Sequence, residues 1–144
     1  MAKIDDRLEE EQRAFELFRH VPKKDLPRVA QLLGDQVTLD AGHTLTEQGR
    51  MESDVYLIVD GTADVLVGGR PVAENGPGES IGEMAVIDHW PRSASVVART
   101  PMRLYHLNGD TFLTILDEVP TVARALAQEL SARLRRLNIR PPGF

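Results

Sequence analysis

The sequence contains no cysteine in 144 residues. This absence excludes disulfides, thiolate metal sites and a cysteine nucleophile. No apolar run reaches the length of a membrane span, and residues 1–20 are charged and amphipathic, without the apolar core or cleavage site of a signal peptide. We therefore expect a cytoplasmic protein with no membrane partner.

Positive charge is also scarce, because 17 Lys and Arg residues stand against 22 Asp and Glu, which gives a formal charge of -5. This balance argues against nucleic acid as the main partner, since phosphate neutralisation supplies most non-specific affinity. A basic cluster near the C-terminus is interpreted as a solvated helix face; it comprises Arg133, Arg135, Arg136 and Arg140.

The length predicts a single domain over residues 1–144. Residues 1–34 show helical spacing of apolar residues, and we expect two helices there, separated by a turn at residues 20–25. Residues 35–107 instead form short segments rich in Val, Ile, Thr and Leu, broken by glycine turns, which predicts a meander of short strands closing into a sandwich or jelly-roll barrel.

Two tight hairpins are expected within the strand region. Asp60–Gly61 would join the strands at residues 55–59 and 63–67, and Gly68–Gly69 would lead into the next strand.

Helical spacing returns over residues 108–138. Asn108 is a predicted N-cap and Pro120 suits the first turn of a second helix. One apolar stripe on that helix is expected to pack on the barrel; it comprises Ala123, Leu126, Leu130, Leu134 and Leu137.

Residues 78–94 read GESIGEMAVIDHWPRSA and combine features of an anion site. If residues 82–87 form a short helix turned out between two strands, its first N–H groups have no internal partners, and Gly82 allows a ligand close to the backbone. Arg92, expected at the start of the next strand, would grip the same phosphate, while Glu83 would accept a hydrogen bond from a neighbouring hydroxyl. A ribose phosphate has both groups. The alternative is a partly buried Glu83–Arg92 ion pair that only stabilises the barrel.

The segment GPGESIGEMA at residues 76–85, followed by PRSASV at 91–96, resembles the phosphate-binding cassette of the cyclic nucleotide-binding domain family. That family includes kinase regulatory subunits, gated channels and catabolite activator proteins, and the resemblance covers nearly the whole chain. It implies an α+β fold, in which an antiparallel jelly-roll or double-stranded β-helix barrel (35–107) is flanked by N-terminal helices (1–34) and two C-terminal lid helices (108–138). Ser80 and Met84 depart from the usual aromatic and leucine, at positions taken to be packing positions.

The resemblance also implies roles for individual residues. The residue matching Glu83 binds the ribose 2'-hydroxyl in the family, and the one matching Arg92 binds the cyclic phosphate. The expected ligand-binding set is Gly82, Glu83, Met84, Ala85, Arg92, Ser93 and Ala94. Residues late enough in the last helix to cover the base are Arg133, Leu134, Leu137 and Asn138.

Ser93 leaves both cAMP and cGMP open, and cAMP is favoured on its frequency in the family. We expect a stand-alone receptor without catalytic activity, cofactor or metal, whose C-terminal helices signal to an unknown effector protein. The alternative is a degenerate member that serves only as a protein interaction module. Direct DNA binding is not expected, because residues 140–144 read RPPGF where regulators of the family carry a helix-turn-helix. Homodimerisation through the leucine stripe stays open.

Overall fold

The computed structural model describes residues 9–136. Its N-terminal part is helical at residues 9–13, continues through the short 3-10 turns η1 (Glu16–Phe18) and η2 (Lys23–Asp25), and ends with α2 (Leu26–Leu33). The predicted second helix is therefore present. The predicted turn at residues 20–25 is only partly right, because η2 occupies its second half and Pro27 opens α2 directly after it.

Eight strands form two four-stranded sheets in which every pair is antiparallel. One sheet has the order β1-β8-β3-β6 and the other β2-β7-β4-β5. The strands of the first sheet are β1 (Gln36–Leu39), β3 (Val55–Asp60), β6 (Ser80–Ile81) and β8 (Met102–Leu107), and those of the second are β2 (Thr44–Thr46), β4 (Ala63–Val67), β5 (Arg70–Asn75) and β7 (Ser95–Ala98). This arrangement confirms the α+β jelly-roll class.

The prediction of a hairpin at Asp60–Gly61 was wrong, and so was that of a simple meander. Strands β3 and β4 lie in different sheets, so the chain crosses from one sheet to the other at this point. Gly61 has φ 93°, and a Cβ at this position would collide with the backbone of Pro101. The Gly68–Gly69 turn does join a hairpin, in which Val67 pairs with Arg70.

The barrel has apolar side chains on both faces of its central strand, β3. Val55 and Leu57 face the helices and join one core cluster with Phe18 and Phe112. Tyr56 and Ile58 alternate with them and join a second cluster inside the barrel. Because both faces are covered, four consecutive residues of β3 are buried.

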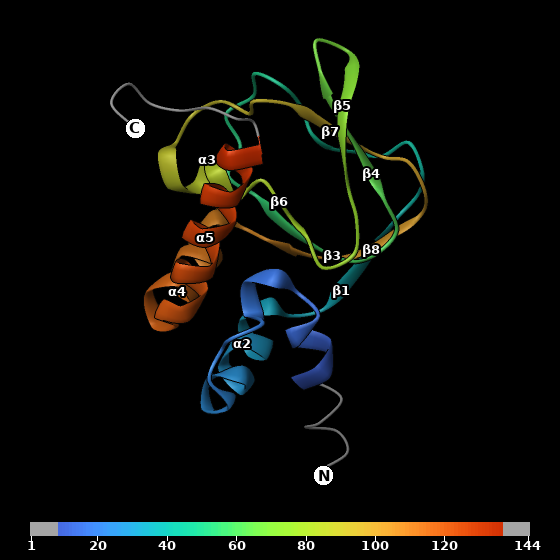
Figure 1. Cartoon of the computed structure of the whole chain (residues 1–144). Helices are drawn as coiled ribbons and strands as arrows, with labels where there is room; N and C mark the ends of the chain where they lie inside the picture. Colours follow the sequence, from blue (N-terminus) through green and yellow to red (C-terminus); the bar gives the residue numbers. More distant parts are fainter. Residues whose placement is uncertain (1–8, 137–144) are drawn as a thin grey trace, which may run out of the picture.

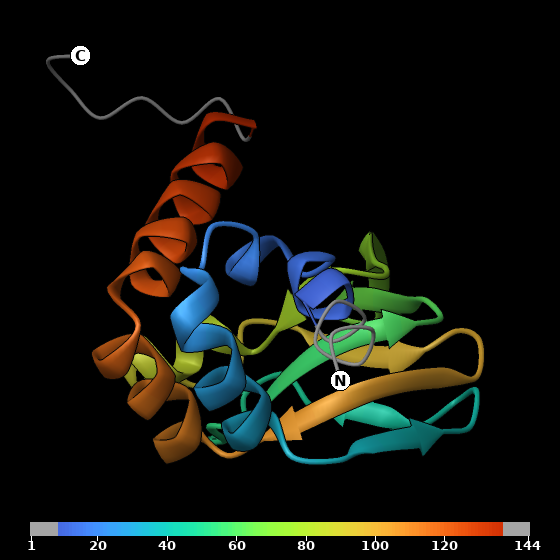
Figure 2. The same ribbon diagram turned by 90° about the horizontal axis from the view of Figure 1, so that it is seen from below.

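Helices α4 (Gly109–Glu118) and α5 (Pro120–Arg136) follow β8, as predicted. The Asn108 side chain accepts a hydrogen bond from the Thr111 amide at 2.8 Å, so Asn108 is the N-cap, and Pro120 is the first residue of α5. Figures 1 and 2 show α5 beside α4 and the N-terminal helical turns, away from the second sheet.

The predicted stripe of α5 was only partly right. Val122 and Leu126 are buried in the core cluster shared with η1 and α4, whereas Ala123 and Leu134 are exposed. The N-terminal helical turns supply an apolar surface that the sequence pattern had not placed next to α5, so the buried face is rotated away from the predicted one. Leu137 lies outside the described residues.

Candidate functional site

The short helix α3 (Glu83–Asp88) follows β6 directly and confirms the predicted helix between two strands. Gly82 precedes it with φ 90° and has no side chain to cap the helix. A Cβ on Gly82 would lie 2.5 Å from both Arg92 Nη1 and the Asp54 carbonyl oxygen. Glycine is therefore required here for two reasons, its left-handed backbone and the close approach of the arginine.

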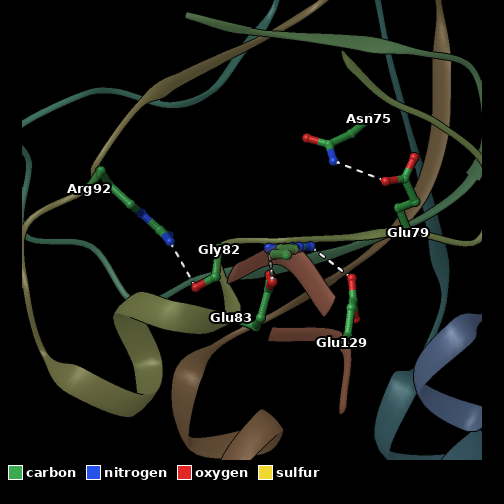
Figure 3. A network of polar contacts seen from close by, with 7 residues as sticks. Asn75, Glu79, Gly82, Glu83, Arg92 and Glu129 are labelled. Atoms are coloured by element: carbon green, nitrogen blue, oxygen red, sulfur yellow. Dashed lines mark hydrogen bonds and ion pairs between the residues drawn. The ribbon is translucent and has the colours of Figure 1, made fainter. Parts of the chain in front are cut away.

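Arg92 lies in the loop before β7, which starts at Ser95, and not at the start of the strand as predicted. Its backbone is fixed by two hydrogen bonds of 2.8 Å, one from the Gly49 amide to its carbonyl and one from its own amide to the Arg50 carbonyl. Its side chain is 5% exposed and donates from Nη1 to the Gly82 carbonyl at 3.0 Å and from Nη2 to the Asp54 carbonyl at 2.7 Å (Figure 3). Nε is buried without a partner.

Glu83 does not pair with Arg92, so the barrel-stabilising Glu83–Arg92 ion pair is wrong. Its side chain is 2% exposed and accepts a hydrogen bond from Arg133 Nη1 at 3.0 Å. Arg133 Nη2 donates to Glu129 at 2.7 Å, and Figure 3 draws both contacts as dashed lines that end on the labelled carboxylates. Burial lowers the pKa of Arg133, but the neighbouring Glu83 and Glu129 carboxylates raise it above its usual value overall. The interpretation of Arg133 as a solvated basic residue is therefore also wrong.

A pocket of about 490 Å³ lies between α3, the loop before β7, strands β4 and β5, and the end of α5. It brings together all seven predicted ligand-binding residues, Gly82, Glu83, Met84, Ala85, Arg92, Ser93 and Ala94. Of the four predicted lid residues, Arg133 lines the pocket. Leu134 does not and is 55% exposed, because it lies on the outer side of α5. Leu137 and Asn138 lie outside the described residues.

Sequence reasoning missed the wall opposite Arg92. Asn75, at the end of β5, donates to Glu79 at 3.4 Å, and Glu79 also accepts from the Gly76 amide at 2.7 Å (Figure 3). These residues were assigned only to a turn, and nothing local indicates that β5 folds across to the cassette. Ser80 also lines the pocket, and its buried Oγ has no partner, so it is more than the packing position expected.

The carboxylates of the pocket wall have partners of their own. Glu83 pairs with Arg133, Glu74 with Arg99, and Asp88 accepts from the Trp90 amide. Arg92, by contrast, forms no ion pair among residues 9–136. A buried guanidinium without a counter-ion is costly, and an anion that enters the pocket would supply the missing charge.

In the described part of the chain, no group of three or more His, Asp or Glu residues could hold a metal ion. No helix of this part combines the length and the apolar character needed to cross a membrane.

The comparisons with known proteins agree with this geometry. The model of the cyclic nucleotide-binding domain family matches residues 36–119. The Pycsar effector protein XpPycTIR of Xanthomonas perforans is 33% identical over 117 residues, which are 81% of this chain and 39% of that protein.

Two solved structures are similar in fold and sequence. The Thermus thermophilus catabolite activator protein superposes with a TM-score of 0.74 and 30% identity over 85% of this chain and 60% of its own. The regulatory domain of Toxoplasma gondii PKA with cAMP gives a TM-score of 0.66 and 30% identity over 78% of this chain and 44% of its own. The chain thus spans well under two thirds of each relative. The fold, the pocket and the family match together show that this chain belongs to the cyclic nucleotide-binding domain family.

Proposed function

We propose that this chain is a cytoplasmic cyclic nucleotide receptor without catalytic activity, which binds cAMP in preference to cGMP and signals to an effector protein through its C-terminal helices. The observation that carries the proposal is Arg92, a buried cation in a pocket wall with no counter-ion among the described residues. The phosphate of the nucleotide would be that counter-ion.

Arg92 retains donors for a phosphate after its two contacts to backbone carbonyls. A guanidinium has five N–H groups, and the hydrogen bonds to Gly82 and Asp54 use one each. No side chain caps the first turn of α3 next to it. The nucleotide would therefore bind its phosphate at Arg92 and approach the amides of residues 83–85.

Glu83 supports a ligand that carries a hydroxyl close to its phosphate. The carboxylate is an acceptor only, so it would take the ribose 2'-hydroxyl as a donor. cAMP is favoured because the Toxoplasma gondii relative at 30% identity is described as bound to cAMP. Ser93, exposed at the pocket, is the position that would distinguish the two bases.

Transmission would start at α3. Val86 of α3 is 2% exposed and packs in the same core cluster as Phe112 and Ile115 of α4 and Leu126 of α5. Movement of the cassette toward the phosphate would therefore shift α4 and α5 together, provided that the ligand prefers the closed state.

Calorimetric titration with cAMP and with cGMP tests the proposal. We expect micromolar binding of cAMP to the wild type. Arg92→Ala should weaken it by roughly 100-fold or more, since each charge-assisted hydrogen bond contributes about 1.5–3 kcal/mol. Arg92→Lys should also bind poorly, because it keeps the charge but loses the planar arrangement of donors.

The matched control is Arg103→Ala, which removes an exposed arginine from β8. Thermal unfolding of each variant establishes that it is folded. If neither nucleotide binds the wild type at millimolar concentration, the receptor proposal fails and a protein interaction module is favoured instead. Binding that survives Arg92→Ala would reject the assigned site.

A further inference from the structure

The ion pair between Arg133 and Glu83 connects two parts of the molecule that are 50 residues apart in the sequence. Glu83 opens α3 at the pocket, and Arg133 belongs to the last two turns of α5. The carboxylate is almost fully buried, with 2% of its side chain exposed, whereas the Arg133 side chain is 31% exposed. The helix therefore brings its charge in from the surface to a carboxylate that has lost its hydration.

Little else holds the end of α5 in place. Leu130 is partly buried against the core, but Ser131, Ala132, Leu134 and Arg135 are all exposed. Residues with so few buried neighbours are the first to open by local unfolding. The contact of Arg133 with Glu83 is thus the main attachment of this segment to the cassette.

Glu129 holds Arg133 in the orientation that this attachment requires. It lies one turn earlier on α5, accepts from Arg133 Nη2 at 2.7 Å, and its side chain is 13% exposed. One guanidinium therefore bridges two carboxylates, one on its own helix and one in the pocket wall. A lysine cannot reproduce this bridge, because its single ammonium lacks the two separated donors of the planar group.

The charges in the pocket decide what happens to this pair when an anion binds. A bare carboxylate at residue 83 would repel a phosphate at Arg92. Displacement of Arg133 would also leave a buried charge without a partner, which is strongly unfavourable. A ligand hydroxyl would therefore bind Glu83 with Arg133 still in place, through the capacity that the carboxylate retains, since two oxygens offer about four acceptor sites.

We propose that Arg133 is a positioning residue, which neutralises Glu83 for an anionic ligand and fastens the end of α5 to the pocket through the same ion pair. Ligand binding and the docking of α5 then depend on one contact. The ligand half rests on the proposed function, whereas the docking half concerns the protein alone.

Hydrogen exchange of the nucleotide-free protein tests the docking half. In Arg133→Gln, we expect the amides of residues 127–136 to exchange about tenfold faster than in the wild type, because local opening becomes easier. Arg135→Gln removes the same charge two positions along the same helix, from an exposed side chain that forms no ion pair among the described residues, and should leave exchange unchanged. Equal exchange in Arg133→Gln and Arg135→Gln would overturn the proposal.

The double variant Glu83→Gln/Arg133→Gln separates the ion pair from general effects of each substitution. Two residues that act through one contact are not additive. We therefore expect the double variant to exchange no faster than Arg133→Gln alone. Fully additive acceleration by the two substitutions would contradict a shared contact.

Titration with cAMP tests the ligand half. Arg133→Gln should weaken binding by about tenfold, equivalent to about 1.4 kcal/mol. Arg133→Lys should recover only part of the loss. Tighter binding by Arg133→Gln would show that Arg133 competes with the ligand and would overturn this half. A wild type that does not bind cAMP refutes the proposed function, while the exchange experiment still decides whether the ion pair docks α5.

Discussion

At the scale of single residues, the site depends on side chains that are absent as much as on those present. Gly82 leaves the space through which Arg92 reaches two backbone carbonyls, and its φ of 90° lies where side chains are rarely tolerated. The cassette glycine and the arginine therefore form one steric unit.

Gly82→Ala should destabilise the fold and also abolish nucleotide binding. The left-handed backbone alone costs about 1–2 kcal/mol for a side chain, and the new Cβ would displace the Arg92 guanidinium from 2.5 Å away. Chemical denaturation and calorimetric titration measure the two effects.

Gly42→Ala is the control for that experiment, since Gly42 has the same φ of 90° with nothing within 4 Å of the added Cβ. It should show only the backbone cost and leave binding intact. Similar losses of binding in the two variants would refute the steric argument.

At the scale of elements, local capping starts the C-terminal helices. Asn108 closes the first turn of α4, and Val119 ends it by donating to Ile115 before Pro120 opens α5. These signals lie within a few residues of one another, so they act without the rest of the fold.

Asn108→Ala should lower the free energy of unfolding by about 1 kcal/mol, the usual cost of losing a side-chain N-cap. Asn108→Asp keeps an acceptor for the Thr111 amide and should remain within a few tenths of a kcal/mol of the wild type. Urea denaturation of the three proteins provides the comparison, and an equal loss in both variants would argue against the capping role.

At the scale of the whole molecule, Glu16 lies where three distant segments meet. Its amide donates to the Gly78 carbonyl at 3.0 Å, at the start of the cassette, and its carboxylate lies close to Glu129 of α5. Partial loss of hydration, although the residue keeps much of its surface exposed, followed by repulsion from Glu129 and Glu79, raises the pKa of Glu16 above its usual 4.5.

A raised pKa in the folded state means that the folded protein binds this proton more tightly than the unfolded chain does. The contribution of Glu16 to stability is therefore greatest below about pH 4.5 and is lost as pH rises through the folded-state pKa. Glu16→Gln should accordingly be more stable than the wild type at pH 7, and this advantage should shrink toward pH 4. Thermal unfolding at several pH values tests the trend, with Glu10→Gln as the control on an exposed position of the preceding helical segment. A constant difference at every pH would rule out the titration of Glu16 as the cause.

The sequence by itself determined the features that depend on near neighbours. The N-cap at Asn108, the start of α5 at Pro120, the Gly68–Gly69 hairpin and the cassette with Gly82, Glu83 and Arg92 were all predictable, because each is a local constraint on the backbone or a short pattern of residue types. Only the tertiary structure decided that β3 and β4 belong to different sheets, that Asn75 faces the pocket, and that Arg133 neutralises Glu83. These outcomes depend on strand order and helix packing between residues far apart in the chain, and no short stretch of sequence contains both partners of such a contact.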